Sequence, residues 1–404
     1  MSACRSCGTT PLLPILSLGE MPLANALLTR EQLKVPEPRF PLDLAFCPHC
    51  TLVQITHAPP PEMMFREYFY FSSFSETMLL HARDIAERLI RERGLGPDSL
   101  VMELASNDGY LLKNYKRAGI PVLGIEPASN IGRVAREQGV ETIDEFFGIE
   151  LAERLPRRAD IVHANNVLAH VPDLNGFVAG IARILKPEGL AVIEAPYLRD
   201  MIEHVEFDTI YHEHLCYFSL TALDALFRRQ GLKLVDVERL RIHGGSLRLF
   251  LAHAAAPQSP APAVAAVLAE EAACQVASYR TYQDFGERVG ALKHELLALL
   301  GELKRQGKTI AAYGASAKGA TLLNTFGIGH QYLDFIIDRS TAKQGYFSPG
   351  MHLEILPPSV LVTRRPDYLL LLVWNFADEI LQQQQAYRNG GGKFIIPIPA
   401  ISVV

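Results

Sequence analysis

The sequence lacks long apolar runs, an excess of positive charge and an export signal. No segment approaches the roughly 18–20 uninterrupted apolar residues that a membrane-spanning helix requires. The net charge is −5 with both signs spread along the chain, so we expect no basic face for a nucleic-acid backbone. The N-terminus, MSACRSCGTT, lacks the basic-then-apolar layout of a secretory signal. We therefore expect a cytoplasmic protein that binds neither membranes nor nucleic acids.

The composition is that of an ordinary globular protein with more than one core. The hydrophobic fraction is 49% and the charged fraction is 21%. A chain of 404 residues exceeds the size at which a single core stops growing, so two or three domains are expected. In the cytoplasm its cysteines should be reduced, which makes their spacing informative.

Four of the six cysteines form two C-x-x-C pairs near the N-terminus, Cys4 with Cys7 and Cys47 with Cys50. In a reducing compartment, two such pairs indicate tetrahedral thiolate ligation of zinc rather than disulfides. A redox-active pair, packing cysteines and a single iron with four thiolates are the alternatives. His49, inside the second pair, could replace one cysteine as a ligand, but four thiolates already fill the coordination shell.

Strands and helices alternate through the middle of the chain. After a proline-rich break at residues 57–64, apolar residues at helical spacing predict a helix from about Ser75 to Gly94. Apolar strands are predicted at 122–127, 159–166 and 190–197, the last after a KPEG turn, with amphipathic helices between them. This alternation indicates a parallel sheet with right-handed crossovers.

A second α/β unit follows a low-complexity joint. AAAPQSPAPAVAAV, residues 254–267, predicts a boundary, and a long helical stretch runs from there to about Gln306. Strands KTIAAYGA, LDFIIDRS and DYLLLLVWNF then resume the α/β pattern. The two α/β units share no residue-level repeat, so they are predicted to be separate domains.

The stretch MELASNDGYLL, residues 102–112, has the layout of a nucleoside-binding turn. A strand ends near Glu103, small residues turn the chain, and a helix begins, so backbone N–H groups and the carboxylate can approach a polar ligand. Glu126 ends the next strand, where such folds place an acid against ribose hydroxyls. The turn lacks G-x-G-x-x-G, which favours a smaller nucleoside ligand over a dinucleotide. The alternative is that both acids only cap helices.

The stretch TIYHEHLCYF, residues 209–218, gathers histidines, an acid and tyrosines, but it is not the H-E-x-x-H zinc-protease motif. His212 and His214 are two positions apart. They would point to different sides of a helix, or share a face of a strand with Glu213 opposite. His212 is expected to face away from any site and to be structural.

Together these stretches resemble the S-adenosylmethionine-dependent sugar C-methyltransferases of deoxysugar biosynthesis. The resemblance rests on ELASNDGYLL, GIEPASNI, HANNVLAHVPDL, LKPEGLAVIEAPYL, TIYHEHLCYFS and HGGSLRLF, and it continues through YGASAKGATLLNTFGI and DRSTAKQGYFSPG to VWNF, in order along the chain. It implies an α/β class I methyltransferase (Rossmann-like) core with a small N-terminal zinc-binding domain and a C-terminal Rossmann-like domain. The implied boundaries are 1–66, 67–255 and 256–404. The implied cofactors are S-adenosylmethionine and Zn²⁺.

The resemblance also implies site residues. The metal ligands would be Cys4, Cys7, Cys47 and Cys50. The cofactor residues would be Glu103, Ser106, Asn107, Asp108, Gly109, Glu126, Asn165 and Asn166. The catalytic residues would be His214, His170, Glu213, Tyr211 and one of Tyr68 and Tyr70.

The implied reaction is methylation of a carbon, which requires an enolate made by removing a proton next to a ketone. Such a step needs a base that titrates near neutral pH, and histidine is the natural choice. His214 would be the base, Glu213 and Tyr211 would position the sugar or polarise the base, and His170 would face the ketone. Tyr68 or Tyr70 would close over the centre. The substrate would be a nucleotide-linked 4-keto-deoxysugar methylated at C-3.

The C-terminal turn GASAKG follows a strand and opens a helix, which invites a comparison with NAD sites. Gly314 and Gly319 do not keep the G-x-G-x-x-G spacing. We instead expect Ser316 and Lys318 to bind the diphosphate of the substrate, with Trp374 and Asn375 lining the same crevice. The remaining alternatives for the whole chain are an O- or N-methyltransferase, a non-catalytic binding protein and a dehydrogenase that uses the C-terminal fold.

Overall fold

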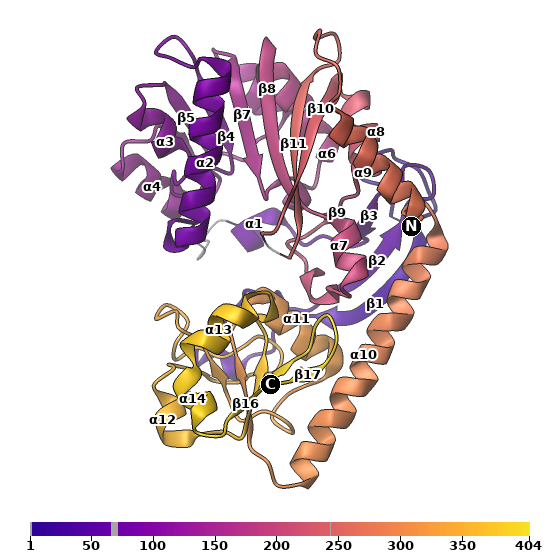
Figure 1. The fold of residues 1–404 in the computed structure, drawn as a ribbon, viewed down its shortest axis with the longest axis vertical. Helices are drawn as coiled ribbons and strands as arrows, with labels where there is room; N and C mark the ends of the chain where they lie inside the picture. The colour runs from indigo at the N-terminus through magenta and orange to yellow at the C-terminus, as the bar shows by residue number, and fades with distance from the viewer. Residues whose placement is uncertain (1, 66–71, 243) are drawn as a thin grey trace.

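The computed structural model describes residues 2–65, 72–242 and 244–404. Two lobes lie one above the other, and the long helix α10 (Tyr279–Arg305) runs along one side of both (Figure 1). The strands of the N-terminal sheet lie between the lobes in the same view. Within these described ranges, no helix combines the length and apolar character needed to cross a bilayer.

The N-terminal module is a small antiparallel sheet in the order β1-β2-β3-β9. Its strands are β1 (Leu13–Met21), β2 (Phe40–Phe46), β3 (Val53–Ile55) and β9 (Cys216–Tyr217). Strand β9 belongs to the stretch at 209–218, so the edge of this sheet comes from the middle of the chain, with Val53 opposite Tyr217. Between β1 and β2 the chain passes through η1 (Gln32–Lys34) and reaches the lower lobe, where Leu28 pairs with Phe347.

The upper lobe is built on a seven-stranded sheet in the order β10-β11-β8-β7-β4-β5-β6. Its strands are β4 (Val101–Leu104), β5 (Val122–Ile125), β6 (Thr142–Ile143), β7 (Ala159–Asn165), β8 (Leu185–Pro196), β10 (Leu232–Leu240) and β11 (Ser246–His253). Strands β4 to β8 pair in parallel, and β11 is antiparallel to both β8 and β10. The chain order reverses between β4 and β7, and at such a switch point an open α/β sheet binds its ligand.

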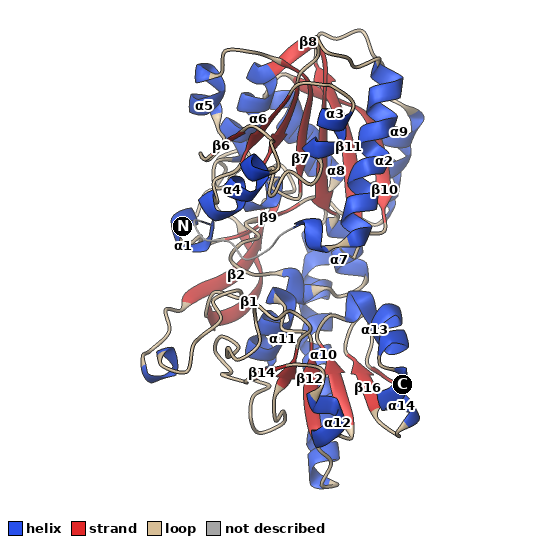
Figure 2. Cartoon of the chain, turned by 90° about the vertical axis from the view of Figure 1, so that its left-hand side faces the viewer, coloured by secondary structure: helices blue, strands red, loops and turns tan. Residues whose placement is uncertain are grey.

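Helices cover both faces of this sheet, as the alternation predicted (Figure 2). They are α2 (Glu76–Arg93), α3 (Leu112–Arg117), α4 (Ser129–Glu137), α5 (Ile149–Arg154), α6 (Leu174–Ile184) and α8 (Leu220–Arg229). The apolar stripe of α2 is buried with Val101 and Ile161 in one core cluster. Ser75 caps its first turn and Gly94 ends it in the left-handed conformation, with φ of 60°. The predicted limits of this helix are therefore confirmed.

One predicted connection differs in detail and another is wrong. Strand β8 begins at Leu185, before KPEG, but residues 186–189 have no partner on β7, because the pairing passes from Leu185 opposite Ala159 to Leu190 opposite Ile161. The stretch up to Gln306 is not one helix. It divides into α9 (Pro262–Ala273) and α10 at Gln275, which has a positive φ of 56°. Buried Glu271 of α9 accepts hydrogen bonds from the backbone N–H groups of Leu220 and Thr221, so α9 packs against the upper lobe.

The lower lobe contains a second sheet in the order β14-β13-β12-β15-β16-β17. Its strands are β12 (Ile310–Tyr313), β13 (Ile336–Ile337), β14 (Ile355–Leu356), β15 (Tyr368–Leu371), β16 (Lys393–Ile396) and the antiparallel β17 (Ser402–Val403). Its helices are α11 (Ala317–Phe326), α12 (Val360–Arg364), α13 (Ala377–Gln383) and α14 (Gln385–Asn389). This sheet also reverses its chain order, between β12 and β15. The short helices elsewhere are α1 (Pro61–Phe65), η2 (Ser72–Phe74), η3 (Leu168–His170), α7 (Leu198–Glu203), η4 (Phe207–Thr209) and η5 (Trp374–Phe376).

Candidate functional site

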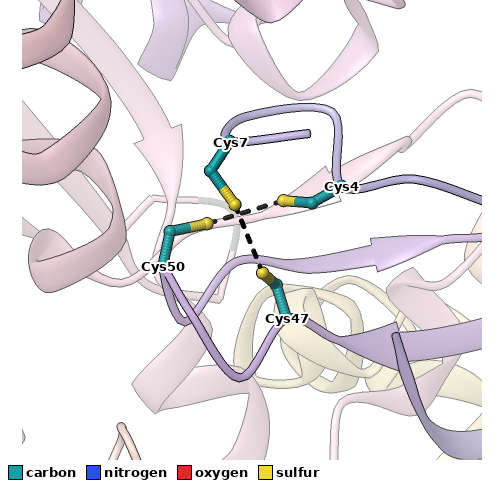
Figure 3. A group of neighbouring side chains, drawn as sticks. All are labelled: Cys4, Cys7, Cys47 and Cys50. Carbon is teal, nitrogen blue, oxygen red and sulfur yellow. Dashed lines mark hydrogen bonds between the residues drawn. The ribbon is translucent and has the colours of Figure 1, made fainter. Parts of the chain in front are cut away.

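The four N-terminal cysteines point toward one another (Figure 3). Their sulfur atoms all lie within 4.8 Å of one another, with Cys4 Sγ 3.5 Å from Cys50 Sγ and Cys7 Sγ 3.5 Å from Cys47 Sγ. Tetrahedral zinc with bonds of about 2.3 Å places its sulfur ligands about 3.8 Å apart. None of the four is in a disulfide. The donor set and its spacing therefore fit Zn²⁺.

The two cysteine pairs sit on matching turns. The N–H of Gly8 donates to the carbonyl of Cys4, and the N–H of Thr51 donates to the carbonyl of Cys47, both at 2.9 Å. Gly8 and Thr51 each adopt a positive φ, of 75° and 61°. His49 is exposed, outside the group of four sulfur atoms. The alternative in which His49 replaces a cysteine has no support in this geometry.

The predicted nucleoside turn lies at the switch point of the upper sheet. After β4 the chain turns through Ala105, Asn107 and Gly109, which have positive φ values of 55°, 49° and 77°. At the end of β7, Asn166 also has a positive φ, of 54°. These left-handed residues let the backbone of both loops fold close to the strand ends. The predicted cofactor residues on β4, β5 and β7 are thus brought to one edge of the sheet.

Buried acceptor oxygens without hydrogen-bond donors gather at this edge. Within the described part of the chain they are both carboxylate oxygens of Glu103, Ser106 Oγ, Asp108 Oδ1, Asn165 Oδ1 and Asn166 Oδ1. Burial, together with the charges of Asp108 and Glu126, raises the pKa of Glu103 well above its ordinary value. A buried, acceptor-rich strand edge fits a ligand that brings positive charge and N–H or O–H donors. S-adenosylmethionine carries a sulfonium, an ammonium and ribose hydroxyls, so the donor set fits it.

Glu126 is fixed on the next strand end. Its two carboxylate oxygens accept hydrogen bonds from the backbone N–H groups of Asn107, at 2.9 Å, and Ala128, at 2.8 Å. Burial raises its pKa to about 7, although these two hydrogen bonds oppose the shift. A carboxylate held in this way is oriented before any ligand arrives. Each of its oxygens retains a second lone pair for a hydroxyl donor.

The segment that leads into α2 lies over this turn. The N–H of Ser72 donates to Asn107 Oδ1 at 2.9 Å, and the N–H of Ser73 donates to Asp108 Oδ2 at 3.2 Å. The predicted tyrosines Tyr68 and Tyr70 come just before these contacts in the chain, but both lie outside the described residues.

Residues 210–215 lie in neither a helix nor a strand, so their side chains follow no regular period. His214 Nδ1 lies 2.8 Å from the carbonyl oxygen of Thr209, which can only accept, so Nδ1 carries the ring proton. His214 Nε2 lies 3.0 Å from the hydroxyl of Tyr211, which donates to it. The ring is therefore held with a basic nitrogen facing a phenol.

His170, in η3, faces the same cluster. Its ring centroid lies 5.0 Å from that of His214, and its Nδ1 lies 2.6 Å from the carbonyl oxygen of Glu213. By the same reasoning Nδ1 of His170 carries a proton. Burial lowers the pKa of His170, so the ring is neutral near pH 7. The predicted residues Tyr211, Glu213, His214 and His170 are thus brought together.

His212 turns away from this cluster, as expected. It is buried against the N-terminal sheet, where its Nε2 lies 3.3 Å from the carbonyl oxygen of Pro41 and its ring meets Phe40 edge-on. Burial lowers its pKa. Of the two histidines in this motif, His212 therefore packs against the N-terminal sheet and His214 belongs to the cluster.

The predicted diphosphate residues lie where the lower lobe meets the stretch before 209. Lys318 Nζ lies 4.7 Å from the ring centroid of Trp374, and the indole N–H of Trp374 donates to Asp208 Oδ2 at 2.7 Å. Glu206 Oε2 lies 3.9 Å from Lys318 Nζ. Ser316 caps α11, accepting from the N–H of Gly319, and Asn375 is half-buried in η5. Lys318 thus faces two carboxylates that the sequence did not assign to it.

A small cavity lies beside the histidine cluster. Its lining includes Ala169, Thr209 and His214, together with Glu206 and Gly245. Gly245 has a φ of 128°, and a Cβ there would lie 2.1 Å from Asp200 Oδ2. Only glycine fits this loop beside the cavity.

Several residues at the site gave no usable signal in the sequence. Asn25, from the chain between β1 and β2, donates to Glu213 Oε1 at 2.6 Å. Glu194 lies on β8, fully buried. Although burial opposes it, His81 and Arg248 hold the pKa of Glu194 below its ordinary value. Glu206 and Asp208 come just before the histidine motif in the chain, and this closeness in sequence was the one indication that they lie at the site.

Three family models match successive parts of the chain. They are a zinc binding domain at residues 4–65, a methyltransferase domain at 78–237 and a C-methyltransferase C-terminal domain at 241–399. The matches agree with the cysteine cluster and with the strand order of the upper sheet. The predicted class I methyltransferase core and the N-terminal zinc-binding domain are therefore confirmed.

Individual proteins are similar over different lengths. The chain is 39% identical over 404 residues to the C-methyltransferase NovU of Streptomyces niveus, a match that covers 99% of this chain and 96% of that protein. It is 28% identical over 177 residues to a ubiquinone biosynthesis O-methyltransferase of Burkholderia thailandensis, covering 39% and 74%. Among solved structures, magnesium protoporphyrin IX methyltransferase from Synechocystis PCC 6803 with bound SAM is 12% identical with a TM-score of 0.35, covering 43% and 79%.

Proposed function

This chain belongs to the S-adenosylmethionine-dependent C-methyltransferase family, and from that premise we propose its substrate and its mechanism. The substrate is a nucleotide-linked 4-keto-deoxysugar, and the methyl group goes to C-3, the carbon next to the ketone. The observation that carries the proposal is the pair of histidines, His214 and His170. Each has its Nδ1 against a backbone carbonyl, and the Nε2 of His214 accepts from the Tyr211 hydroxyl as the basic nitrogen.

Carbon methylation requires a base, and His214 is placed for that role. Its Nε2 takes the proton from C-3, and the Nδ1–H bond to Thr209 stabilises the imidazolium that results. The Tyr211 hydroxyl, 3.0 Å from Nε2, can swing to donate to the oxygen of the enolate as negative charge develops there. His170, neutral because of its burial, and Glu213 hold the sugar and its ketone beside this pair.

The cofactor is held by the acceptor-rich edge of the upper sheet. Glu126 would hold its ribose hydroxyls. Its sulfonium and ammonium groups would be held by the residues at and after the ends of β4 and β7, which are Glu103, Ser106, Asn107, Asp108, Gly109, Asn165 and Asn166. When bound, S-adenosylmethionine supplies an electrophilic methyl group. The protein holds His214 and the sugar next to the cofactor site. The reacting groups are then already in position, so the entropy cost of bringing them together is met by binding.

The nucleotide part of the substrate is proposed to bind at Lys318 and Trp374, with Ser316 and Asn375 beside them. Lys318 Nζ is buried and has no hydrogen-bond partner within the described residues. Glu206 balances its charge, but burial raises the pKa of Glu206 to about 7, with Lys318 opposing the shift. Glu206 can therefore give up its charge at little cost near neutral pH, which leaves Lys318 available to a diphosphate.

Solvent exchange tests the proposed reaction. The purified protein is incubated in deuterium oxide with a nucleotide-linked 4-keto-deoxysugar and no S-adenosylmethionine. We expect deuterium at C-3 because His214 removes that proton before the methyl group arrives, and we expect a C-methyl product once the cofactor is added. Methylation at oxygen or nitrogen without exchange at C-3 would replace this function with an O- or N-methyltransferase.

Replacing Lys318 with alanine should raise the KM for the nucleotide-sugar at least about tenfold, because a buried charge-assisted contact to phosphate is lost. The KM for S-adenosylmethionine should stay unchanged, since that ligand binds in the other lobe. Steady-state kinetics in both substrates measure the two constants, and Lys393→Ala, at an exposed position on β16, is the matched control. An unchanged KM for the nucleotide-sugar would remove Lys318 from the site.

A further inference from the structure

Asn25 lies in the N-terminal zinc-bearing module, yet its side chain reaches the histidine cluster. We propose that Asn25 is a positioning residue for the reaction, which fixes the carboxylate of Glu213 and through it the arrangement of His170 and His214. The inference rests on the proposed function. With Asn25 in this role, the N-terminal module contributes to the reaction centre as well as binding a structural metal.

The contact itself is short and joins distant parts of the chain. Asn25 Nδ2 donates to Glu213 Oε1 at 2.6 Å across 188 positions of sequence. Glu213 is 5% exposed, whereas Asn25 is exposed. A buried carboxylate gains much more from a hydrogen bond than an exposed amide does. The interaction therefore matters mainly for Glu213.

The backbone around Asn25 is fixed at both ends. On one side Met21 ends β1 and pairs with Phe40. On the other side Leu28 and Phe347 exchange two backbone hydrogen bonds, of 2.9 and 2.8 Å. The amide of Asn25 thus comes from a tethered turn, and holding it in place costs less conformational entropy than holding a side chain on a free loop.

Glu213 stands between the two histidines. Its carbonyl oxygen receives the Nδ1–H of His170 at 2.6 Å, and its peptide bond leads directly into His214. A shift of the Glu213 backbone would therefore move both rings, and the bond from Asn25 to its side chain opposes such a shift. Asn25 is a neutral donor, so it orients the carboxylate without neutralising it. Among the described residues, the titratable groups of the same cluster are His170, His214 and Tyr211.

The test compares two substitutions of one residue. Asn25→Ala should lower kcat about tenfold or more through loss of a charge-assisted hydrogen bond, with little change in either KM, and should slow solvent exchange at C-3 without S-adenosylmethionine to the same degree. Asn25→Asp keeps the shape but sets a second carboxylate against Glu213. Its rate relative to wild type should rise as the pH falls from about 8 to about 6, because the paired carboxyls then share a proton.

A double variant separates positioning from a structural role. If Asn25 acts through Glu213, the loss in Asn25→Ala combined with Glu213→Gln should be far smaller than the product of the two single losses. Zinc content and thermal stability should stay at the wild-type level, and Asn389→Ala, on the exposed face of α14, serves as the matched control.

The outcomes separate this inference from the proposed function. Wild-type kcat in Asn25→Ala, or losses that simply multiply in the double variant, would overturn the role of Asn25 while leaving the reaction intact. If the wild-type protein itself gives no exchange and no C-methyl product, the proposed function fails instead. Should Asn25→Ala lose zinc or fold poorly, the pH dependence of the isosteric Asn25→Asp decides: a flat ratio to wild type across that range rejects the positioning role.

Discussion

Replacing His214 with asparagine should lower the rate of methyl transfer by about 10³-fold, within the range that general-base catalysis contributes. Asparagine can still accept from Tyr211, but it cannot take a proton from carbon at neutral pH. Deuterium exchange at C-3 should fall by the same factor, because both readouts depend on the same proton removal. Product formation by mass spectrometry and exchange by NMR measure the two rates.

Two other histidines provide controls for this result. His212→Asn disturbs packing against Pro41 and Phe40, so it should lower stability while leaving the rate per folded molecule near wild type. His294→Asn changes an exposed residue of α10 and should alter neither. Wild-type turnover in His214→Asn, in the corresponding variant of His170 and in the double variant would reject the enolate mechanism.

Replacing Cys47 with alanine should unfold the N-terminal module and abolish activity with it. Structural zinc contributes roughly 10–16 kcal/mol of apparent binding free energy in small zinc domains, which matches or exceeds the roughly 5–15 kcal/mol that holds a whole domain folded. Cys47 is fully buried, and its neighbours Cys4 and Cys50 lie in the same core. Loss of one ligand therefore removes both the metal and the centre of the module's packing.

Metal analysis, thermal unfolding and limited proteolysis check this prediction. We expect zinc near one equivalent in the wild type and near none in Cys47→Ala, with early cleavage between β1 and β3 and a lower Tm. Cys274→Ala is the matched control, since Cys274 is exposed on the end of α9. A zinc-free Cys47→Ala protein with wild-type Tm and turnover would contradict the structural role of the metal.

Features set by neighbouring residues were predictable from the sequence. Ser75 and Gly94 bound α2, and Ser316 and Gly327 bound α11, because caps act within one turn of the helix. The two C-x-x-C pairs likewise carry their own turn geometry. Local chemistry of this kind needs no knowledge of the rest of the fold.

Features set by distant pairing were not predictable in the same way. KPEG has the composition of a turn, but the pairing of Leu185 with Ala159 ahead of it makes it a bulge inside strand β8. Lys318 looked like an open phosphate site, and only the lobe contact reveals Glu206 and Asp208 beside it. The bond from Asn25 to Glu213 had no signature, because neither residue's neighbours point to the other. In each case the partner comes from another part of the chain.

The pairing of β3 with β9 limits how this protein can be recombined. The last strand of the N-terminal sheet is supplied by residues that directly follow His214, so the cysteine-bearing module has no complete sheet of its own. Chimaeras that exchange N-terminal modules between relatives would have to carry residues 209–218 along with them. A cut made only between the N-terminal module and the rest of the chain would leave two mismatched strand edges beside the histidine cluster.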